Sequence, residues 1–266
     1  MPGASSRLPA GVLVAVLAGA ACAPKVRLSL PTGAGTPLTA VAGAAQEARG
    51  SCRAPAALTA DLRLSGRIDG ERVRGTLQVG VDADGMRLEG IAPFGAPVFV
   101  LAARADQAVL LLPRETAVAR GASAADLLDA VVGVPLLPAD LLAIVSGCGL
   151  AAWQVEGGTR FGDGWVRLDV DGGRRLWLQT PPQGPPVIAA AEDGRWRVEY
   201  TRADTGWPTA IRLARVGSVN TDVVFAVDAP EALATLPPGA LDVDVPAGAR
   251  EVSLADLRKN RELAER

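Results

Sequence analysis

The chain of 266 residues contains no histidine, three cysteines and only ten aromatic residues. Without an imidazole there is no histidine base or ligand, which excludes the usual Ser-His-Asp and Cys-His catalytic arrangements. The balance of 27 Lys+Arg against 29 Asp+Glu also lacks the basic excess that binds a phosphate backbone, so we expect no nucleic-acid partner. No Cys-x-x-Cys pair occurs, and no nucleophile is paired with a plausible base. We therefore expect no metal, no cofactor and no enzymatic activity.

The composition is that of a turn-rich globular protein. Hydrophobic residues make up 49% of the chain, which is ample for a core, and glycine and proline together account for 50 residues. After the first 21 residues, no stretch approaches the roughly 18 consecutive apolar residues of a membrane-spanning helix. These features favour one mainly β domain over two small ones.

The N-terminus has the features of a secretory signal. Arg7 precedes Leu8 to Ala21, an apolar or small stretch of 14 residues that is too short to span about 30 Å of hydrocarbon as a helix. The run Leu17-Ala18-Gly19-Ala20-Ala21-Cys22 resembles the bacterial lipoprotein signal, in which the cysteine is lipidated and becomes the mature N-terminus. Ala23 is similar to the residue that follows the cysteine in lipoproteins sent to the outer membrane. The alternative is a plain signal peptide in which Cys22 is incidental.

Composition divides the chain into four parts. We predict a signal peptide over residues 1–21 and a lipidated N-terminus with a flexible tether over residues 22–37, because prolines and glycines recur there. The main domain is expected over residues 38–228, followed by an irregular strap and a C-terminal helix over residues 229–266. The protein would then be held at the outer membrane by its lipids and face the periplasm.

Two cysteines remain after Cys22, namely Cys52 and Cys148. In a chain sent to an oxidising compartment, an even pair favours a disulfide bond. Two separate buried thiols are the alternative.

Alternating apolar and polar residues predict a long antiparallel sheet. In the segment Asp61–Asp69, apolar side chains at every second position give the period of a half-buried strand, and the same alternation resumes from Arg72 to Val81. Asp69-Gly70 between them is typical of a tight hairpin turn, and four more Asp-Gly pairs predict a meander. Further strands are predicted at 86–91, 98–104, 108–112, 165–171, 174–179, 187–191, 196–202, 209–216 and 223–227, and an extra one at 241–245.

Four helices are predicted, of which two follow each other in the middle of the chain. Ser123 and Asp126 form a capping-box pattern that opens a helix over 124–132, and Pro138 opens a second helix that stops at Gly147. Residues 38–49 show weaker helical spacing. Ser253 can cap a last, polar helix that ends near residue 266. Helices such as the central two can cover the apolar face of a curved sheet.

Several segments together resemble one known family. The run Met86-Arg87-Leu88-Glu89-Gly90-Ile91-Ala92-Pro93-Phe94-Gly95-Ala96-Pro97-Val98-Phe99 is similar to the outer-membrane lipoprotein receptor LolB and its relatives, in which a strand leads through a Pro-apolar-Gly loop into the next strand. The likeness continues through Asp126-Leu127-Leu128, Gly133-Val134-Pro135 and Leu141-Leu142, and again at Trp196-Arg197-Val198-Glu199-Tyr200. It covers roughly residues 58–228.

This resemblance implies a fold and a function. The fold is mainly β: a strongly curved antiparallel sheet, an unclosed half-barrel, with a helical lid. The implied function is to receive client lipoproteins from a LolA-like periplasmic carrier, to bind their acyl chains and to help insert them in the outer membrane. The protein itself would be a monomer. The loop of Pro93, Phe94 and Gly95 would contact the membrane or client. The acyl-chain cavity would be lined by Leu88, Val98, Val100, Leu110, Leu112, Leu127, Leu128, Val131, Leu141, Leu142 and Val145.

Sequence leaves three alternatives open. A fully packed core has the same composition as an apolar cavity, so these residues can equally be core. Phe94 can fold back over the sheet edge instead of protruding. Finally, a structural or interaction lipoprotein of the cell envelope could have this fold without any transfer activity.

Overall fold

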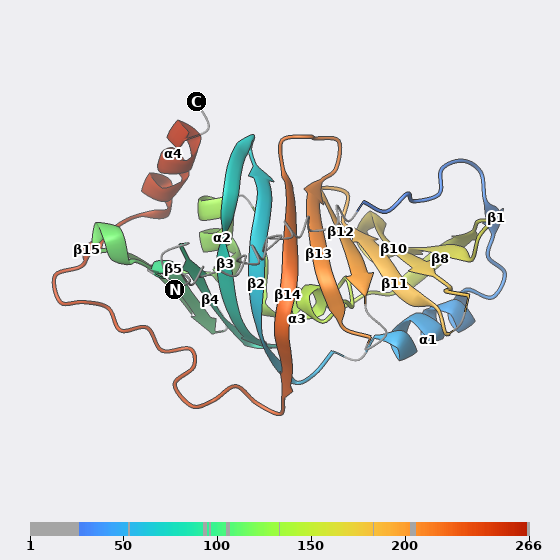
Figure 1. Cartoon of the computed structure of the whole chain (residues 1–266), viewed down its shortest axis with the longest axis horizontal. Helices are drawn as coiled ribbons and strands as arrows, with labels where there is room; N and C mark the ends of the chain where they lie inside the picture. The colour runs from blue at the N-terminus through green and yellow to red at the C-terminus, as the bar shows by residue number, and fades with distance from the viewer. Residues whose placement is uncertain are drawn as a thin grey trace, which may run out of the picture.

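In the part of the chain that the structure describes, fifteen strands form one sheet, which bends into an unclosed half-barrel (Figure 1). The computed structural model describes residues 27–264 except 53, 93, 94, 96, 105, 106, 133, 183 and 203–205. Along the sheet the strands follow the order β1-β8-β9-β10-β11-β12-β13-β14-β2-β3-β4-β5-β6-β7-β15. All neighbours are antiparallel except β15 and β7, which pair in parallel. The predicted fold class, a curved antiparallel sheet with a helical lid, is confirmed.

The strands have the following bounds. The first eight are β1 (Thr36–Pro37), β2 (Ala57–Ile68), β3 (Glu71–Asp82), β4 (Gly85–Ile91), β5 (Pro97–Arg104), β6 (Gln107–Leu112), β7 (Ala117–Ala122) and β8 (Val155–Arg160). The others are β9 (Trp165–Val170), β10 (Arg174–Gln179), β11 (Val187–Glu192), β12 (Trp196–Arg202), β13 (Pro208–Arg215), β14 (Asp222–Leu233) and β15 (Arg250–Glu251).

The five Asp-Gly pairs lie, as predicted, at the connections between neighbouring strands. At the β2–β3 turn both Asp69 (φ 49°) and Gly70 (φ 90°) have the positive φ of a type I′ turn. At the β11–β12 turn the carboxylate of Asp193 instead accepts the backbone N–H groups of residues 195 and 196. This local chemistry explains why a meander can be predicted from the sequence.

Helices α1, α2 and α3 cover the concave side of the sheet, and α4 packs on α2. The bounds of these helices are α1 (Val41–Ser51), α2 (Ala124–Val132), α3 (Pro138–Val145) and α4 (Leu254–Ala264). At the start of α2, the Ser123 hydroxyl accepts the N–H of Asp126 at 3.1 Å, as the capping pattern predicts. α2 and α3 contact β3 to β6 and β13, α1 contacts β8 and β11, and α4 contacts α2 (Figure 1). The central helices therefore form the expected lid.

Two cores lie under these helices. The first joins the lid to β2–β6, and Leu58, Met86 and Leu101 are among its fully buried members. The second joins α1 to β9–β13, with Leu176 and Ile211 fully enclosed. The half-barrel is thus covered by different helices in its two halves.

Residues 27–37, predicted as part of a flexible tether, instead lie along the outer face of the sheet. Leu28 and Leu30 pack against Trp165 and Trp177 there, and Thr36–Pro37 form β1 at the edge of β8. The tether prediction is therefore wrong for this segment. Composition suggested a free chain, but the two leucines bury apolar surface against the tryptophans, which offsets the entropy lost on ordering. Cys22 lies outside the described residues.

A chain of ion pairs centred on the buried Glu199 runs beneath this segment on the outer face. The carboxylate of Glu199, only 1% exposed, accepts from Arg212 at 2.8 Å and from the backbone N–H of Leu28 at 3.1 Å. Arg212 also holds Asp222 through two hydrogen bonds of 2.6 and 2.9 Å. The hydrogen bonds between Arg212 and Asp222 lower the pKa of the Asp222 carboxyl group. The same bonds raise the pKa of the Arg212 guanidinium. Removal of one partner from such a network lowers the stability of the fold, because it leaves the other charge buried and unpaired.

We expect Arg212→Met to lower the free energy of unfolding by about 3 kcal/mol, because it leaves the Glu199 carboxylate buried without its nearest cation. Urea unfolding at neutral pH measures this loss. Arg63→Met is the matched control, since Arg63 pairs with the exposed Asp228 and an exposed pair contributes about 0–1 kcal/mol.

The double variant with Glu199→Met should recover most of that loss, and equal losses in Arg212→Met and Arg63→Met would contradict the prediction. The pH dependence gives a second check. The pKa of Asp222 in the folded protein lies below its unfolded value of about 3.9. Its contribution to the free energy of unfolding is therefore fully present above that pH and is lost as the pH falls through the folded pKa. That acid-side loss should be smaller in Arg212→Met.

Three features of the sheet differ from expectation. β1, β7, β8 and β15 were not predicted, and β14 extends to Leu233 instead of ending at Val227. The extra strand predicted at 241–245 is absent, since that segment lies in the irregular strap over 234–249. Segments such as Ala117–Ala122 are rich in alanine and glycine, so they carry too few large apolar side chains to show alternation.

Candidate functional site

An apolar cavity of about 470 Å³ lies between the concave face of the sheet and the lid. Its floor comes from β2–β5, β13 and β14, and its roof comes from α2, α3 and the segment that joins them. The volume falls in the range of about 300–1,000 Å³ that is typical of small-molecule sites. The interior under the lid is therefore only partly filled.

Five of the predicted cavity residues line this space. They are Leu88 of β4, Val98 of β5, Leu128 of α2, and Leu141 and Val145 of α3. Another five lie in the core around it without lining it: Leu110, Leu112, Leu127, Val131 and Leu142. Their side chains fill the space between sheet and lid, which is the packed-core alternative.

Val100 does not belong to the cavity, so this prediction is wrong. Its cross-strand partners are Glu89 and Leu111, which share the outer face of the sheet, whereas its neighbour Leu101 pairs with Leu88 on the inner face. The outer face is also buried at this edge, since Leu111 and Val118 are 7% and 0% exposed. Strand β5 is consequently apolar on both faces, and alternation cannot tell which side is inside.

Strand β2 and the far strands supply lining residues that sequence reasoning did not assign to the cavity. The side chains not predicted include Leu62, Leu64, Ile68, Leu77, Ile91, Phe99, Ile144, Ile211, Leu213, Val223 and Phe225. For β2 the signal was present, because Leu62, Leu64 and Ile68 alternate with polar or charged residues and mark one dry face. Which helix covers that face depends on contacts distant in sequence, which a local pattern does not contain.

Gly90 shapes the floor of the cavity. A Cβ at this position would lie 2.3 Å from Cε1 of Phe99, so the ring lies directly over the glycine. Any larger residue at position 90 would displace the ring. The glycine thus fixes where the aromatic wall of the cavity stands.

The other half of the half-barrel contains the second core. Tyr200 is buried there at 4% exposure, and burial raises the pKa of its hydroxyl. The guanidinium of Arg202 stacks over that ring at 5.2 Å and donates to the carbonyl oxygens of Gly147 and Ile188. Arg202 thereby ties the loop after α3 to the sheet.

A disulfide between Cys52 and Cys148 holds the same region. It joins the residue after α1 to the loop after α3, with a Cα–Cα distance of 5.2 Å. This is the bridge expected from the pair of cysteines. One end of the lid is therefore fixed both to α1 and to the floor.

Comparison with solved structures addresses the fold. A LolA superfamily protein from Nitrosomonas europaea superposes with a TM-score of 0.52 over 77% of this chain and 98% of its own, at 12% identity. The chain has a LolA-like fold. Two further structures are less similar. A DUF1329 family protein from Desulfovibrio piger has a TM-score of 0.49 at 11% identity, over 76% of this chain and 97% of its own. An outer membrane lipoprotein-sorting protein domain from Vibrio parahaemolyticus has a TM-score of 0.47 at 10% identity, over 75% of this chain and 95% of its own.

No protein-family model matches the sequence, and no curated protein matches it significantly. At 12% identity the likeness supports the LolA-like fold and carries no activity with it. It does not distinguish LolB from other proteins with this fold, so LolB membership stays a prediction from the sequence motifs.

The predicted contact loop of Pro93, Phe94 and Gly95 connects β4 to β5 in this LolA-like half-barrel. Pro93 and Phe94 lie outside the described residues. Gly95 is exposed and has a φ of 80°, and its N–H donates to the carbonyl of Ala92 at 2.9 Å. Ala92 and Val98, which flank the loop, both line the cavity. The contact of Phe94 with membrane or client stays a prediction.

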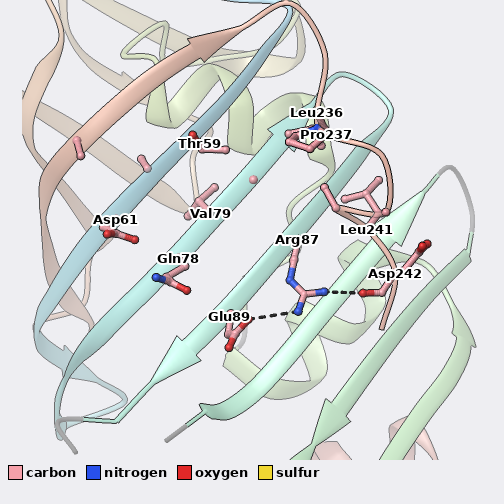
Figure 2. Close-up of a pocket in the computed structure, with 15 residues that line it drawn as sticks. Thr59, Asp61, Gln78, Val79, Arg87, Glu89, Leu236, Pro237, Leu241 and Asp242 are labelled. Atoms are coloured by element: carbon pink, nitrogen blue, oxygen red, sulfur yellow. Dashed lines mark hydrogen bonds and ion pairs between the residues drawn. The ribbon is translucent and has the colours of Figure 1, made fainter. Parts of the chain in front are cut away.

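A second pocket, of about 600 Å³, lies on the outer face of the LolA-like sheet, where the strap crosses β2–β4 (Figure 2). Arg87 donates there to the carbonyl of Asp242 at 2.8 Å and pairs with Glu89 at 3.3 Å. Asp61 and Gln78 line the same pocket (Figure 2). Its charged lining suits water and strap contacts rather than acyl chains.

Two further properties concern the described residues alone. None of the helices there is long and apolar enough to cross a membrane. Likewise, no group of three or more Cys, Asp or Glu side chains in the described ranges is placed to hold a metal ion.

Proposed function

We propose that this protein is an outer-membrane-anchored lipoprotein that binds acyl chains of client lipoproteins in its inner cavity and helps to insert them in the outer membrane, as a LolB-like receptor does. The anchor would be the lipidated Cys22. The cavity would receive its client from a LolA-like periplasmic carrier. A monomer suffices, since one chain supplies both the floor and the lid.

The apolar cavity under the lid is the observation that carries this proposal. It is walled by leucine, isoleucine, valine and phenylalanine side chains from sheet and helices alike. Each methylene moved from water into such a space gains about 0.8 kcal/mol, so a chain of several methylenes is held without any polar contact. Release to a membrane needs only a more favourable apolar environment, so transfer would proceed by differential affinity and without chemistry.

The experiment is mass spectrometry of lipids extracted from the full-length protein purified without detergent exchange. Acyl-bearing molecules in stoichiometric amount support the proposal. An extract without them supports the envelope interaction lipoprotein instead. Depletion of the protein in its host gives an independent check, because stalled transfer would leave other lipoproteins in the periplasm or inner membrane.

We expect Phe94→Glu to leave the melting temperature unchanged and to impair delivery to acceptor vesicles. A phenylalanine inserted in an apolar phase gains about 1.5–3 kcal/mol, which corresponds to a roughly 10- to 150-fold loss on replacement by a charge. Transfer of a labelled lipoprotein from protein to vesicles measures this. Phe94→Leu is the control, and unchanged transfer in Phe94→Glu would contradict the role of the loop.

A further inference from the structure

The first described residues fix where the chain coming from Cys22 reaches the domain. The Arg27 guanidinium pairs with the Asp222 carboxylate at 3.1 Å, and the N–H of Leu28 donates to Glu199 at 3.1 Å. Leu28 also packs into the tryptophan cluster of the outer face. The connection toward Cys22 therefore starts beside Asp222, the first residue of β14.

Asp222 stands at the end of the sheet where the cavity opens. Its neighbour Thr221 lines the cavity, and the Thr221 hydroxyl accepts the N–H of Asp69 at 3.1 Å. This hydrogen bond joins the β13–β14 loop to the β2–β3 turn. At the same end Val98 lines the cavity and is also 39% exposed, so the cavity reaches the surface there.

The same end also carries exposed apolar side chains. Val216 and Val219 of the β13–β14 loop are 41% and 86% exposed. With Val98 they are three of the four large apolar side chains exposed among the described residues. Exposed arginines stand nearby, Arg67 and Arg72 at the β2–β3 turn. Valines flanked by guanidinium groups suit the boundary between lipid tails and phosphate headgroups.

Chain length limits how far this end can stand from the anchor. Five peptide links separate Cys22 from Arg27, and five links reach at most about 18 Å. We infer that the end of the half-barrel formed by the β13–β14 loop and the β2–β3 turn lies on the bilayer that holds Cys22, with the cavity mouth toward the lipid. This inference rests on the acylation of Cys22 proposed above and adds the orientation, which that proposal does not contain.

The test uses the acylated mature protein in vesicles of phosphatidylethanolamine and phosphatidylglycerol. Val219→Cys carries an environment-sensitive fluorophore, and Ala83→Cys, exposed at the β3–β4 turn on the opposite end of β3, is the matched control. The native Cys52 and Cys148 are joined to each other and do not react. We expect a shift to shorter wavelength, and quenching by acyl-chain quenchers, at position 219 only. Equal signals at both positions, or none at 219, would overturn the orientation.

The second part of the test lengthens the segment between Cys22 and the domain. Twenty Gly and Ser residues inserted between Cys22 and Arg27 extend the tether to roughly 25–30 Å on average, so the signal at position 219 should fall toward that at position 83. Replacing Val219 or Val216 by glutamate should slow transfer to the membrane about tenfold for each valine, because a buried valine contributes about 1.5 kcal/mol.

The outcomes separate this inference from the proposed function. The mass of the N-terminal peptide reports acylation, and an unmodified Cys22 overturns the orientation and the anchor together. A protein that extracts with acyl chains but shows no lipid contact at Val219 overturns the orientation alone. Lipid contact at Val219 without bound acyl chains leaves the orientation standing and overturns acyl-chain binding.

Discussion

Leu64→Trp should weaken the binding of a long-chain fatty acid by about three orders of magnitude while the protein stays folded. Leu64 is half-buried and lines the cavity, and its cross-strand partners are Gly75 and Phe225. The glycine leaves room for an indole over β3, so the larger ring extends into the cavity and not into packed core. Excluding about five methylenes at about 0.8 kcal/mol each costs about 4 kcal/mol, or roughly 1,000-fold in affinity.

Displacement of a fluorescent fatty acid measures this affinity, and thermal unfolding shows that the variant is folded. Leu233→Trp is the matched control, because Leu233 is a partly buried strand residue that does not line the cavity. We expect its affinity to equal that of the unmodified protein. An affinity unchanged in Leu64→Trp would mean that acyl chains bind elsewhere. A loss in Leu233→Trp as large as in Leu64→Trp would mean that the effect is indirect.

Local chemistry explains which parts of the fold can be predicted from the sequence. The bounds of α2, 124–132, follow from its Ser123 cap and its apolar side. The hairpin at Asp69-Gly70 follows from two residues that tolerate positive φ. Both signals lie within a few residues of the element that they specify, and they do not depend on the rest of the fold.

The cavity residues could be predicted only in part, because the decisive contacts are distant in sequence. Leu88 and Leu110 are equally apolar and both point inward, yet only Leu88 reaches the open space, since Leu110 lies in the packed core. The difference depends on where α2 and α3 rest on the sheet. Val100 shows the related limit that an all-apolar strand does not reveal its inner face. For residues 27–37, composition suggested a free chain where Leu28 and Leu30 are packed on tryptophans.

Removing the disulfide should lower the free energy of unfolding by about 4–5 kcal/mol in the chain-entropy model. The bridge spans a sequence separation of 96 residues, so it closes a long loop in the unfolded chain and removes much of its conformational freedom. For a domain of this size, about 4–5 kcal/mol corresponds to a melting temperature lower by roughly 10–15 °C. Scanning calorimetry of the Cys52→Ala, Cys148→Ala double variant measures this.

The position of the bridge implies that its loss acts on the lid as well as on the unfolded chain. Cys148 follows α3 and lies next to Gly147, whose carbonyl accepts from Arg202. Without the sulfur link, Arg202 still ties this loop to the floor, so we expect the cavity to survive and fatty-acid affinity to change less than tenfold below the melting temperature. Reduction of the unmodified protein is the control and should reproduce the double variant. A melting temperature unchanged by reduction would contradict the stabilising role, and loss of fatty-acid binding in the folded variant would show that the lid depends on the disulfide alone.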